Sequence, residues 1–476
     1  MPVFRYSSSL AAPASAVYAW HESPGALERL LPPWTSVRLV ESRGGLQPGA
    51  RVVLRLGPKP LQRRWVANIR ECQPGFGFTD EQIEGPFKYW LHRHRFVERN
   101  EAECNLEDKI DYRLPYGPAG TIIAGAAVRS QLERTFRFRH RRTADDIRRH
   151  RAFANRPKLA FAVSGASGLI GTELVNFLRS GGHRVHTLVR RRPRDNSQEI
   201  FWDPTNETID ARALEGIDVV VHLAGANIAA SHWTTERKRA IVASRVQGTG
   251  LLCRTLAESK KPPAALIAAS AVGYYGNRGA DRLDEESEHG AGFLSETCRA
   301  WEQATEPASK AGIRVVNLRI GVVLSARAGA LARMLTPFRL GAGGILGDGR
   351  QFVPWIALDD LVGVVQFLAY NPELHGPVNA VAPTPVTNRV FTKALGRVLK
   401  RPTLLPLPAA AVRLAFGEMG DELLLSGCRA LPDKLERTGF AFLHPEIEQA
   451  LEIELGRGSS RLAEQQRNKR NTVDEH

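Results

Sequence analysis

Apolar residues in the second half of the chain fall into short runs separated by segments of helical periodicity. The runs predict buried strands, which we expect at 159–164, 185–189, 218–223, 265–269, 313–319 and 378–381. Between the runs, apolar residues recur every three or four positions, which predicts amphipathic helices. This alternation is typical of an α/β fold with a doubly wound parallel sheet of the Rossmann type.

The first 150 residues follow a different pattern, in which apolar and polar residues alternate as in half-buried antiparallel strands. Strands are predicted within 4–12, 36–42, 50–57, 62–71, 75–85, 89–99 and 103–115. A helical segment over 13–31 breaks at Pro24-Gly25, and a long helix is expected over 118–150. These elements predict an α+β domain in which a long helix closes an antiparallel sheet.

The boundary between the two patterns lies near 150–158, where an arginine-rich stretch ends and the first predicted strand of the second pattern is about to begin. We therefore expect one domain over 1–150 and a second over 157–455, in agreement with a length that exceeds one ordinary domain. Residues 400–455 are predicted to form a small C-terminal helical cap. The polar segment 456–476 is predicted to be a disordered tail.

A glycine-rich turn joins the first predicted strand of the second domain to the helix that follows it. Gly165, Gly168 and Gly171 are spaced three apart. In this context the first glycine permits a tight turn, the second allows the backbone to approach a pyrophosphate, and the third lets the helix pack on the strand. The helix N-terminus then offers free N–H groups to the phosphates. We expect a dinucleotide site made by these glycines and by the residues of the same turn, Ser167, Leu169 and Ile170.

The residues after the second strand of this domain favour NADP over NAD. An NAD protein places Asp or Glu there, to bind the ribose 2′-hydroxyl. Here Arg190 and Arg191 occupy the position, and no carboxylate precedes Asp195. A guanidinium binds a 2′-phosphate through a charge-assisted fork. The alternative is an arginine run that is only solvated.

Charge distribution and cysteine spacing argue against a nucleic-acid partner and against a cysteine metal site. The net charge is +15, but much of it lies in 134–151, with eight arginines and two aspartates, and in 190–194. No aromatic-plus-basic motif accompanies these runs, so we expect no nucleic-acid partner. The five scattered cysteines have no metal-type spacing and predict no metal site. Without an apolar run long enough for a membrane span or a signal-like start, the chain is predicted to be cytoplasmic.

Residues 157–455 resemble the extended short-chain dehydrogenase/reductase superfamily, in its atypical sugar-nucleotide epimerase-like branch. The likeness is carried by AVSGASGLIG, VVVHLAGANIA, ASAVGYYG, VVNLRIGVVLS and GAGGILGDGRQFVPWIALDDLV. It implies that Leu223, Ala224 and Gly225 lie along the cofactor, and that Arg319 lines the substrate pocket. The resemblance also leaves a homodimer open.

The catalytic residues of that superfamily are altered in this chain. The resemblance implies a Ser and a Tyr-x-x-x-Lys pair, but Ala271 takes the serine position and Leu294 and Cys298 take the places of Tyr and Lys. We expect Ser270, Tyr274 and Tyr275 to serve instead. The alternatives are that both tyrosines only pack or gate the site, and that Cys298 is an inert buried thiol.

Residues 1–150 resemble the START-like helix-grip superfamily, also called the polyketide-cyclase and lipid-transport superfamily. The GPFKYWLHRHRF stretch and the closing helix carry this likeness. It implies a curved sheet around a helix with an apolar cavity. The aromatic residues that are candidates for lining this cavity are Trp20, Trp34, Trp65, Phe78, Phe87, Trp90 and Phe96. Each of them could equally be plain core.

Together these patterns predict an NADP-dependent epimerase or oxidoreductase, acting on a small-molecule substrate, fused to a domain that binds an apolar ligand. The missing Tyr-x-x-x-Lys pair leaves a second hypothesis. In that case the chain is a catalytically impaired NADP-binding sensor or ligand-handling protein.

Overall fold

The computed structural model describes residues 2–457 except 59 and 196, and gives no side-chain description for 117–121. The predicted disordered tail lies outside the described residues from 458 onward. The chain divides into two compact units, an N-terminal unit of Met1–Pro157 with Asn176–Gly182, and a C-terminal unit that comprises the rest. None of the described helices is both long and apolar enough to cross a membrane.

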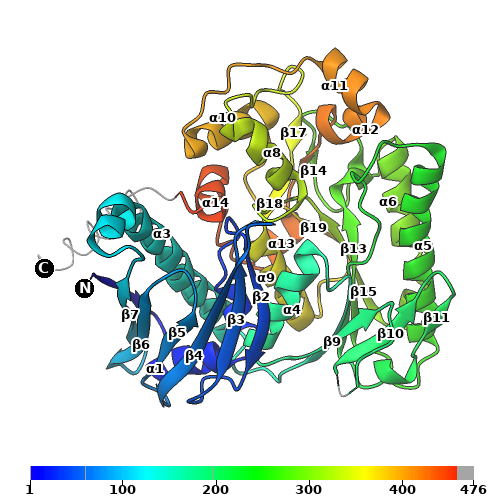
Figure 1. Cartoon of the computed structure of the whole chain (residues 1–476). Coiled ribbons are helices and arrows are strands. Elements are labelled where there is room, and N and C mark those ends of the chain that lie inside the picture. Colours follow the sequence, from blue (N-terminus) through cyan, green and yellow to red (C-terminus); the bar gives the residue numbers. More distant parts are fainter. Residues whose placement is uncertain (1, 59, 196, 458–476) are drawn as a thin grey trace, which may run out of the picture. The chain divides into compact units, whose positions relative to one another are not determined.

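The N-terminal unit contains one antiparallel sheet of seven strands in the order β1-β7-β6-β5-β4-β3-β2 (Figure 1). The strands are β1 (Val3–Leu10), β2 (Val37–Arg43), β3 (Arg51–Leu56), β4 (Arg63–Gln73), β5 (Gly77–Glu84), β6 (Tyr89–Asn100) and β7 (Glu103–Arg113). Each lies where the period-two pattern predicted a strand. The pattern succeeds because one face of the sheet is buried, so that alternate side chains must be apolar.

Three helices complete this unit: α1 (Ala14–Glu22), α2 (Ala26–Arg29) and α3 (Gly117–Arg151). The left-handed Gly25, with a φ of 90°, separates α1 from α2 at the predicted break. Two apolar clusters fill the interior. Trp20, Phe78 and Phe96 belong to one, and Trp65, Phe87 and Trp90 to the other. Six of the seven predicted aromatics therefore pack in core clusters, while the Trp34 ring lies edge-on to Phe138.

The C-terminal unit contains an eight-stranded sheet in the order β11-β10-β9-β8-β12-β13-β15-β19. Its strands are β8 (Ala160–Ser164), β9 (Arg184–Val189), β10 (Glu199–Asp203), β11 (Thr208–Ile209), β12 (Val219–His222), β13 (Ala265–Ala271), β15 (Arg314–Ile320) and β19 (Gly376–Ala380). All pairs are parallel except β10 with β11. The predicted doubly wound sheet is confirmed, although the apolar runs did not predict β10 and β11.

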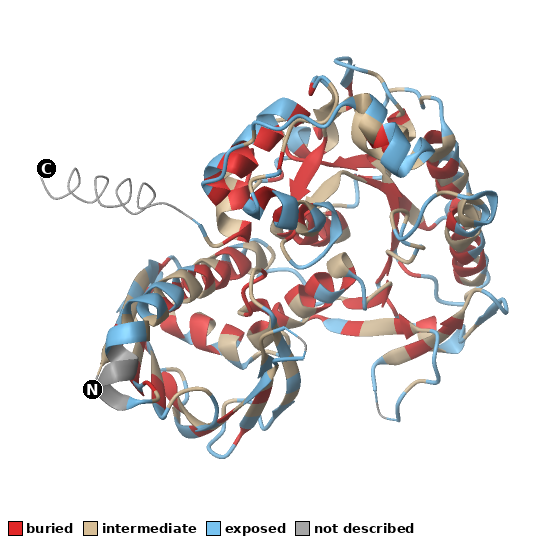
Figure 2. Ribbon diagram, turned by 45° about the horizontal axis from the view of Figure 1, so that its top comes forward, coloured by how far each residue is buried: buried red, intermediate tan, exposed pale blue. Residues whose placement is uncertain are grey.

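Helices surround this sheet, and Figure 2 shows their exposed outer faces around the buried strands. They are α4 (Leu169–Ser180), α5 (Thr235–Ala257), α6 (Phe293–Gln303), α7 (Glu306–Lys310), α8 (Gly329–Arg339), α9 (Leu358–Tyr370) and α10 (Asn388–Leu399), with short turns η1 (Arg212–Leu214) and η2 (Val272–Tyr275). Three two-stranded ladders supplement the sheet: β14 (Arg282–Leu283) with β21 (Arg429–Ala430), β16 (Val322–Leu324) with β18 (Trp355–Ala357), and β17 (Phe352–Val353) with β20 (Val386–Thr387).

The C-terminal segment is helical, as expected for the cap. It contains α11 (Ala409–Phe416), α12 (Glu418–Gly420), η3 (Asp421–Leu425), α13 (Asp433–Arg437) and α14 (Ile447–Glu454). Asp360, fully buried in α9, anchors it by accepting the backbone N–H groups of Leu443 and His444 at 2.8 and 3.0 Å. Asp360 thus braces the segment that precedes α14.

The strand order of the sheet indicates where a ligand would bind. The order reverses direction between β8 and β12, because β9 and β10 extend to one side and β13, β15 and β19 to the other. In open parallel sheets, ligands bind at the carboxyl ends of the strands beside such a reversal.

Candidate functional site

The glycine turn follows β8 at this reversal, and its backbone requires glycine at two positions. Gly165 has a φ of 68°, and a Cβ atom there would lie 2.8 Å from the carbonyl carbon of Leu223. A Cβ on Gly171 would lie 2.3 Å from the carbonyl oxygen of Gly165. The first glycine therefore allows contact with the segment after β12, and the third allows α4 to start against the turn. Both roles agree with the fingerprint.

The same turn presents free polar backbone to its open side. Ser167 and Gly168 are exposed, and a Cβ on Gly168 would meet only the Gly165 carbonyl oxygen, at 3.2 Å. The N–H groups of Leu169 and Ile170, in the first turn of α4, donate to no described residue. Free N–H groups at a helix N-terminus bind phosphate oxygens. The turn is therefore a cradle suited to a pyrophosphate.

A buried pair, Ser164 and His222, fixes the segment after β12 in place. Ser164 Oγ lies 2.7 Å from His222 Nδ1 and accepts the N–H groups of Leu223 and Ala224 at 3.1 and 3.3 Å. Burial lowers the pKa of His222 to about 4, so the ring is neutral and can accept the Ser164 proton. Gly225 follows this segment, and a Cβ there would meet Arg245 at an ordinary 3.5 Å. The sequence reasoning missed this pair, although two polar residues ending adjacent apolar runs could have indicated it.

The arginines after β9 differ in their partners. Arg191 forms an ion pair with Glu199 and also donates to the Arg192 carbonyl oxygen at 3.0 Å. Arg190 is exposed and pairs with no acidic residue in the described part of the chain. Of Arg190 and Arg191, the guanidinium of Arg190 is therefore the one that is available for an anionic ligand.

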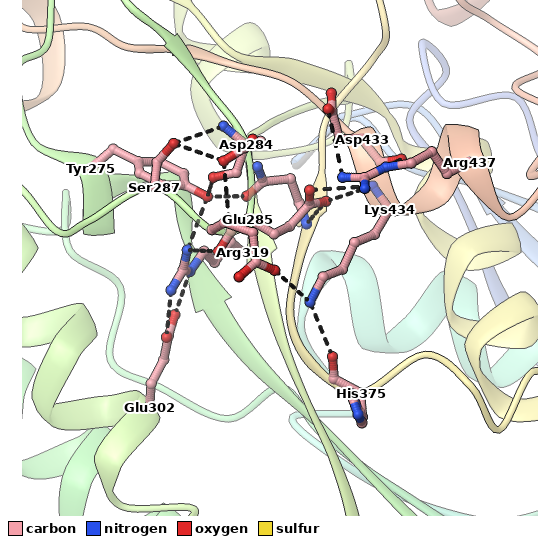
Figure 3. A network of polar contacts seen from close by, with 12 residues as sticks. Tyr275, Asp284, Glu285, Ser287, Glu302, Arg319, His375, Asp433, Lys434 and Arg437 are labelled. Atoms are coloured by element: carbon pink, nitrogen blue, oxygen red, sulfur yellow. Dashed lines mark hydrogen bonds and ion pairs between the residues drawn. The ribbon is translucent and has the colours of Figure 1, made fainter.

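A buried polar network lies further along the same edge of the sheet, centred on Arg319 in β15 (Figure 3). Arg319 Nε and Nη2 donate to the two carboxylate oxygens of Glu302 at 2.9 and 3.0 Å. Ser270, at the end of β13, donates to Glu302 Oε1 at 2.7 Å. Parallel pairing sets Ser270 opposite Arg319, which explains how residues distant in sequence meet.

The two predicted tyrosines occupy different surroundings. Tyr275 is fully buried, and its hydroxyl accepts from Arg319 Nη1 at 3.0 Å and lies 2.8 Å from the Asp284 carbonyl and from Asn379 Oδ1. Burial raises the pKa of Tyr275, so its phenol stays protonated. Tyr274 is half-buried, its ring centroid lies 3.5 Å from the Arg319 guanidinium carbon, and its hydroxyl bonds to no described residue. Of these two tyrosines, Tyr274 is the one whose hydroxyl is free of described partners and open to a ligand.

Glu285 joins this network to the cap. It is buried, and its carboxylate accepts the backbone N–H groups of Asn379 at 3.0 Å and Lys434 at 3.2 Å (Figure 3). Burial raises the pKa of Glu285. The network therefore spans β15, β19 and α13. The sequence analysis had not singled out Glu302, Glu285 or Asn379.

Helix α6 supplies no acid or base at the positions where the superfamily has Tyr and Lys. Cys298 is buried, and burial raises the pKa of its thiol to about 12. A thiol held in its protonated form is not a nucleophile at neutral pH. Leu294 is apolar. A surface hollow of about 490 Å³ lies over α5 and Phe293, but no predicted site residue lines it.

Comparison with protein families gives three matches along the chain. Residues 161–380 match the NAD dependent epimerase/dehydratase family, and residues 10–138 match the polyketide cyclase / dehydrase and lipid transport family. Residues 407–453 match a domain of unknown function, DUF1731, which overlaps the cap.

Curated relatives and solved structures agree with these matches. An epimerase family protein of Mycobacterium bovis is 48% identical over 290 residues, which is 61% of this chain and 95% of the relative. The human epimerase family protein SDR39U1 is 37% identical over 292 residues, 61% of this chain and 97% of the relative. A crystal structure of SDR39U1 with NADPH superposes with a TM-score of 0.58 at 34% identity, over 62% of this chain and 99% of that one. The nucleoside-diphosphate sugar epimerase of Corynebacterium glutamicum has a TM-score of 0.80 at 32% identity, over 99% of this chain and 100% of that one.

Proposed function

Because the chain belongs to the epimerase family of the extended short-chain dehydrogenase/reductases, we propose that its C-terminal unit, taken as residues 157–455, binds NADP(H) and acts on a small-molecule substrate. One observation carries the proposal. The Gly165–Gly171 cradle lies against the 223–225 segment at the reversal of strand order, with the unpaired Arg190 at the end of β9. The human relative crystallised with NADPH supports the same choice.

The residues present fit this cofactor. The free N–H groups of Leu169 and Ile170 would hold the pyrophosphate, beside Ser167 and Gly168. The segment from Leu223 to Gly225 would lie along the adenine ribose, and the guanidinium of Arg190 would bind the 2′-phosphate, with Arg191 beside it. When bound, the cofactor supplies hydride transfer.

The residues around Arg319 would serve the substrate. We assign Tyr274 to hold a proton at its hydroxyl, because that hydroxyl bonds to no described residue and its ring lies over a cation. Ser270 and Tyr275 act as positioning residues, because the hydroxyls of both form hydrogen bonds with the Glu302–Arg319 pair. A nucleoside-diphosphate sugar is the substrate class that the bacterial structure suggests.

A second candidate function rests on α6. Because Leu294 and Cys298 offer no proton at neutral pH, the chain would bind NADP(H) without rapid turnover and act as a sensor. Tyr274 distinguishes the two functions. An active enzyme should lose about 10²- to 10⁴-fold in turnover on Tyr274→Phe, with NADPH affinity unchanged. If the chain is a sensor, no carbonyl compound or nucleoside-diphosphate sugar in a panel should lead to NADPH oxidation.

The proposal extends to a ligand of the N-terminal unit. Residues 1–150 would hold an apolar ligand, consistent with the polyketide cyclase and lipid transport match. Organic extraction of the purified full chain, followed by mass spectrometry, should yield such a ligand.

A homodimer would form through the α5 and Phe293 surface, where Val242 and Val246 line the hollow. Light scattering of the full chain measures this state.

Calorimetric titration with NADPH and NADH tests the cofactor. We expect NADPH to bind more tightly than NADH, and Arg190→Ala to weaken NADPH by at least about 10-fold, since a hydrogen bond to a charged group is worth about 1.5–3 kcal/mol. Arg212→Ala, which removes an exposed charge outside the 190–194 run, is the matched control and should bind like the parent chain. Equal affinity for the two cofactors would overturn the choice of NADP, and binding of neither would overturn the function.

A further inference from the structure

The inner face of the N-terminal sheet carries a polar row between its two apolar clusters. Along β6 the alternate residues Trp90, His92, His94 and Phe96 read apolar, polar, polar, apolar. Register sets Asp80 of β5 opposite His92, and Asp108 of β7 opposite His94. Two aspartates and two histidines from three adjacent strands therefore meet in the interior, with side-chain exposures of 17% or less.

Both imidazoles lie between the two carboxylates. His92 Nδ1 and His94 Nε2 lie 3.2 and 3.4 Å from the same oxygen, Asp80 Oδ2. The other two ring nitrogens, His92 Nε2 and His94 Nδ1, lie 2.9 and 2.7 Å from Asp108 Oδ1. Each ring thus directs both of its nitrogens at an acceptor.

Hydrogen-bond alignment distinguishes these four contacts. Of the four contacts, only His92 Nε2 to Asp108 has the alignment of a hydrogen bond, and His94 Nδ1 is buried without one. The two ring nitrogens that face Asp80 Oδ2 make no aligned hydrogen bond to it, and with that oxygen they form a group of three donor atoms, an arrangement that a bound cation also produces.

The donor spacing fits a metal ion. Ligand atoms bound at about 2.0–2.1 Å to a tetrahedral Zn²⁺ lie roughly 3.3–3.4 Å from one another. The separations of Asp80 Oδ2 from His92 Nδ1 and His94 Nε2 agree with this value, and the three donors lie within 4.8 Å of one another. We propose that Asp80, His92 and His94 bind one divalent transition-metal ion of the Zn²⁺ class, through one carboxylate and two imidazoles.

Asp108 supplies the support that such sites require. Histidine ligands of metals usually donate their second N–H to a carboxylate, which fixes the ring and raises its basicity. Asp108 takes this place for His92 through a hydrogen bond to Nε2, and the same oxygen lies 2.7 Å from His94 Nδ1. The other oxygen of Asp108 bonds to His140 Nε2 on α3. His140 Nδ1 lies 2.7 Å from Ser8 Oγ, so β1 and α3 hold Asp108 in turn.

The cluster is not fully enclosed. Asp80 and His94, the most exposed members at 17% and 11%, provide the side from which an ion enters. Three protein ligands leave a coordination position for water or another ligand.

Metal titration of the full chain tests this proposal. Protein stripped with a chelator is titrated with Co²⁺, followed by visible absorption, and the bound Co²⁺ is then displaced with Zn²⁺. We expect one ion per chain, with d–d bands of nitrogen and oxygen ligands and no thiolate charge-transfer band from the five free cysteines. Asp80→Asn and His94→Gln should each weaken binding by at least about 100-fold, more than the loss usual for an outer residue.

The matched control is His21, a half-buried histidine of the same unit whose Nδ1 bonds to the Val17 carbonyl oxygen. His21→Gln should bind Co²⁺ like the parent chain. Failure of the parent chain to bind either ion in a saturable way would overturn the proposal, and so would parent-like binding by both ligand variants. If a variant does not fold, a Zn²⁺-dependent rise in the melting temperature of the parent chain provides the independent measurement, and no rise counts against the site.

Discussion

The two units each bury a polar cluster, and the clusters differ in how donors match acceptors. In the C-terminal unit, the Glu302 carboxylate accepts hydrogen bonds from Arg319 and Ser270, and one cation faces one anion. In the N-terminal unit, two carboxylates face two imidazoles through four close contacts, of which one has the alignment of a hydrogen bond. The first cluster is complete as built, whereas we propose that the second binds a cation from solution.

This difference separates two uses of buried polar groups. A saturated cluster fixes positions: Arg319 holds the Tyr274 ring and the Tyr275 hydroxyl, both at the carboxyl edge of the sheet. An unsaturated cluster costs stability until a ligand binds, because unpaired buried polar groups are expensive. Unmatched acceptors are therefore a better indication of a ligand site than burial or charge alone.

The largest expected effect follows from breaking the saturated cluster. Arg319→Met should destabilise the C-terminal unit by about 3–5 kcal/mol, because it leaves the Glu302 carboxylate buried without a cation. Urea unfolding followed by tryptophan fluorescence measures the change. The double variant Arg319→Met with Glu302→Leu should recover much of the loss, since no unpaired charge remains. A single variant as stable as the parent chain would contradict the role of this pair.

The sequence predicted what depends on neighbours along the chain. The seven strands of the N-terminal unit follow from alternation, and the Gly165 turn follows from a strand, a glycine and a helix in succession. The clusters escaped prediction because their members meet through strand register: Asp80 with His92, and Ser270 with Arg319. Histidines two apart in a strand, as in HRHR, were the one local indication of the N-terminal cluster.

The cofactor residues show the same limit. The spacing located Arg190, but only the structure distinguishes it from Arg191, because Glu199 comes from β10, a strand that the apolar runs did not predict. For the tyrosines, the sequence offered two equivalent phenols. Burial and the position of Arg319 separate them, and both depend on tertiary packing.

A second prediction concerns how the free energy of unfolding depends on pH through the protonation of His222. Burial lowers the pKa of His222 to about 4, whereas an unfolded histidine titrates near 6.5. As pH falls below about 6.5, the unfolded chain takes up a proton that folded His222 refuses, so the free energy of unfolding declines until pH reaches about 4. The loss from this residue approaches about 3 kcal/mol over that window.

Urea unfolding between pH 7 and pH 4.5 measures this loss in the parent chain and in His222→Asn. The variant should show a shallower decline. It keeps some decline because burial also lowers the pKa of His183 to about 4. Identical pH profiles for the two proteins would show that His222 does not remain neutral in the folded chain.

A third prediction concerns the support of the unsaturated cluster. Asp108→Asn keeps the size of the side chain but removes the charge that faces both imidazoles. We expect Zn²⁺ affinity to fall by about 10- to 100-fold while one ion per chain still binds, because an outer carboxylate tunes its ligands without replacing them. Competition with a chromophoric chelator measures the affinity. A complete loss of binding would instead make Asp108 a direct ligand.

The smallest effect tests the surface arginines, where one guanidinium is paired and its neighbour is not. Glu199→Gln removes the partner of Arg191, whose side chain is 47% exposed. Exposed pairs contribute about 0.2–1 kcal/mol, so the fold should change little and NADPH affinity should rise by at most about 5-fold as Arg191 becomes available. Adding Arg190→Ala to this variant then decides between the two residues. If Arg191 replaces Arg190 once Glu199 is gone, the double variant should bind NADPH more tightly than Arg190→Ala alone. If the 2′-phosphate depends on the position of Arg190, the two should bind equally weakly.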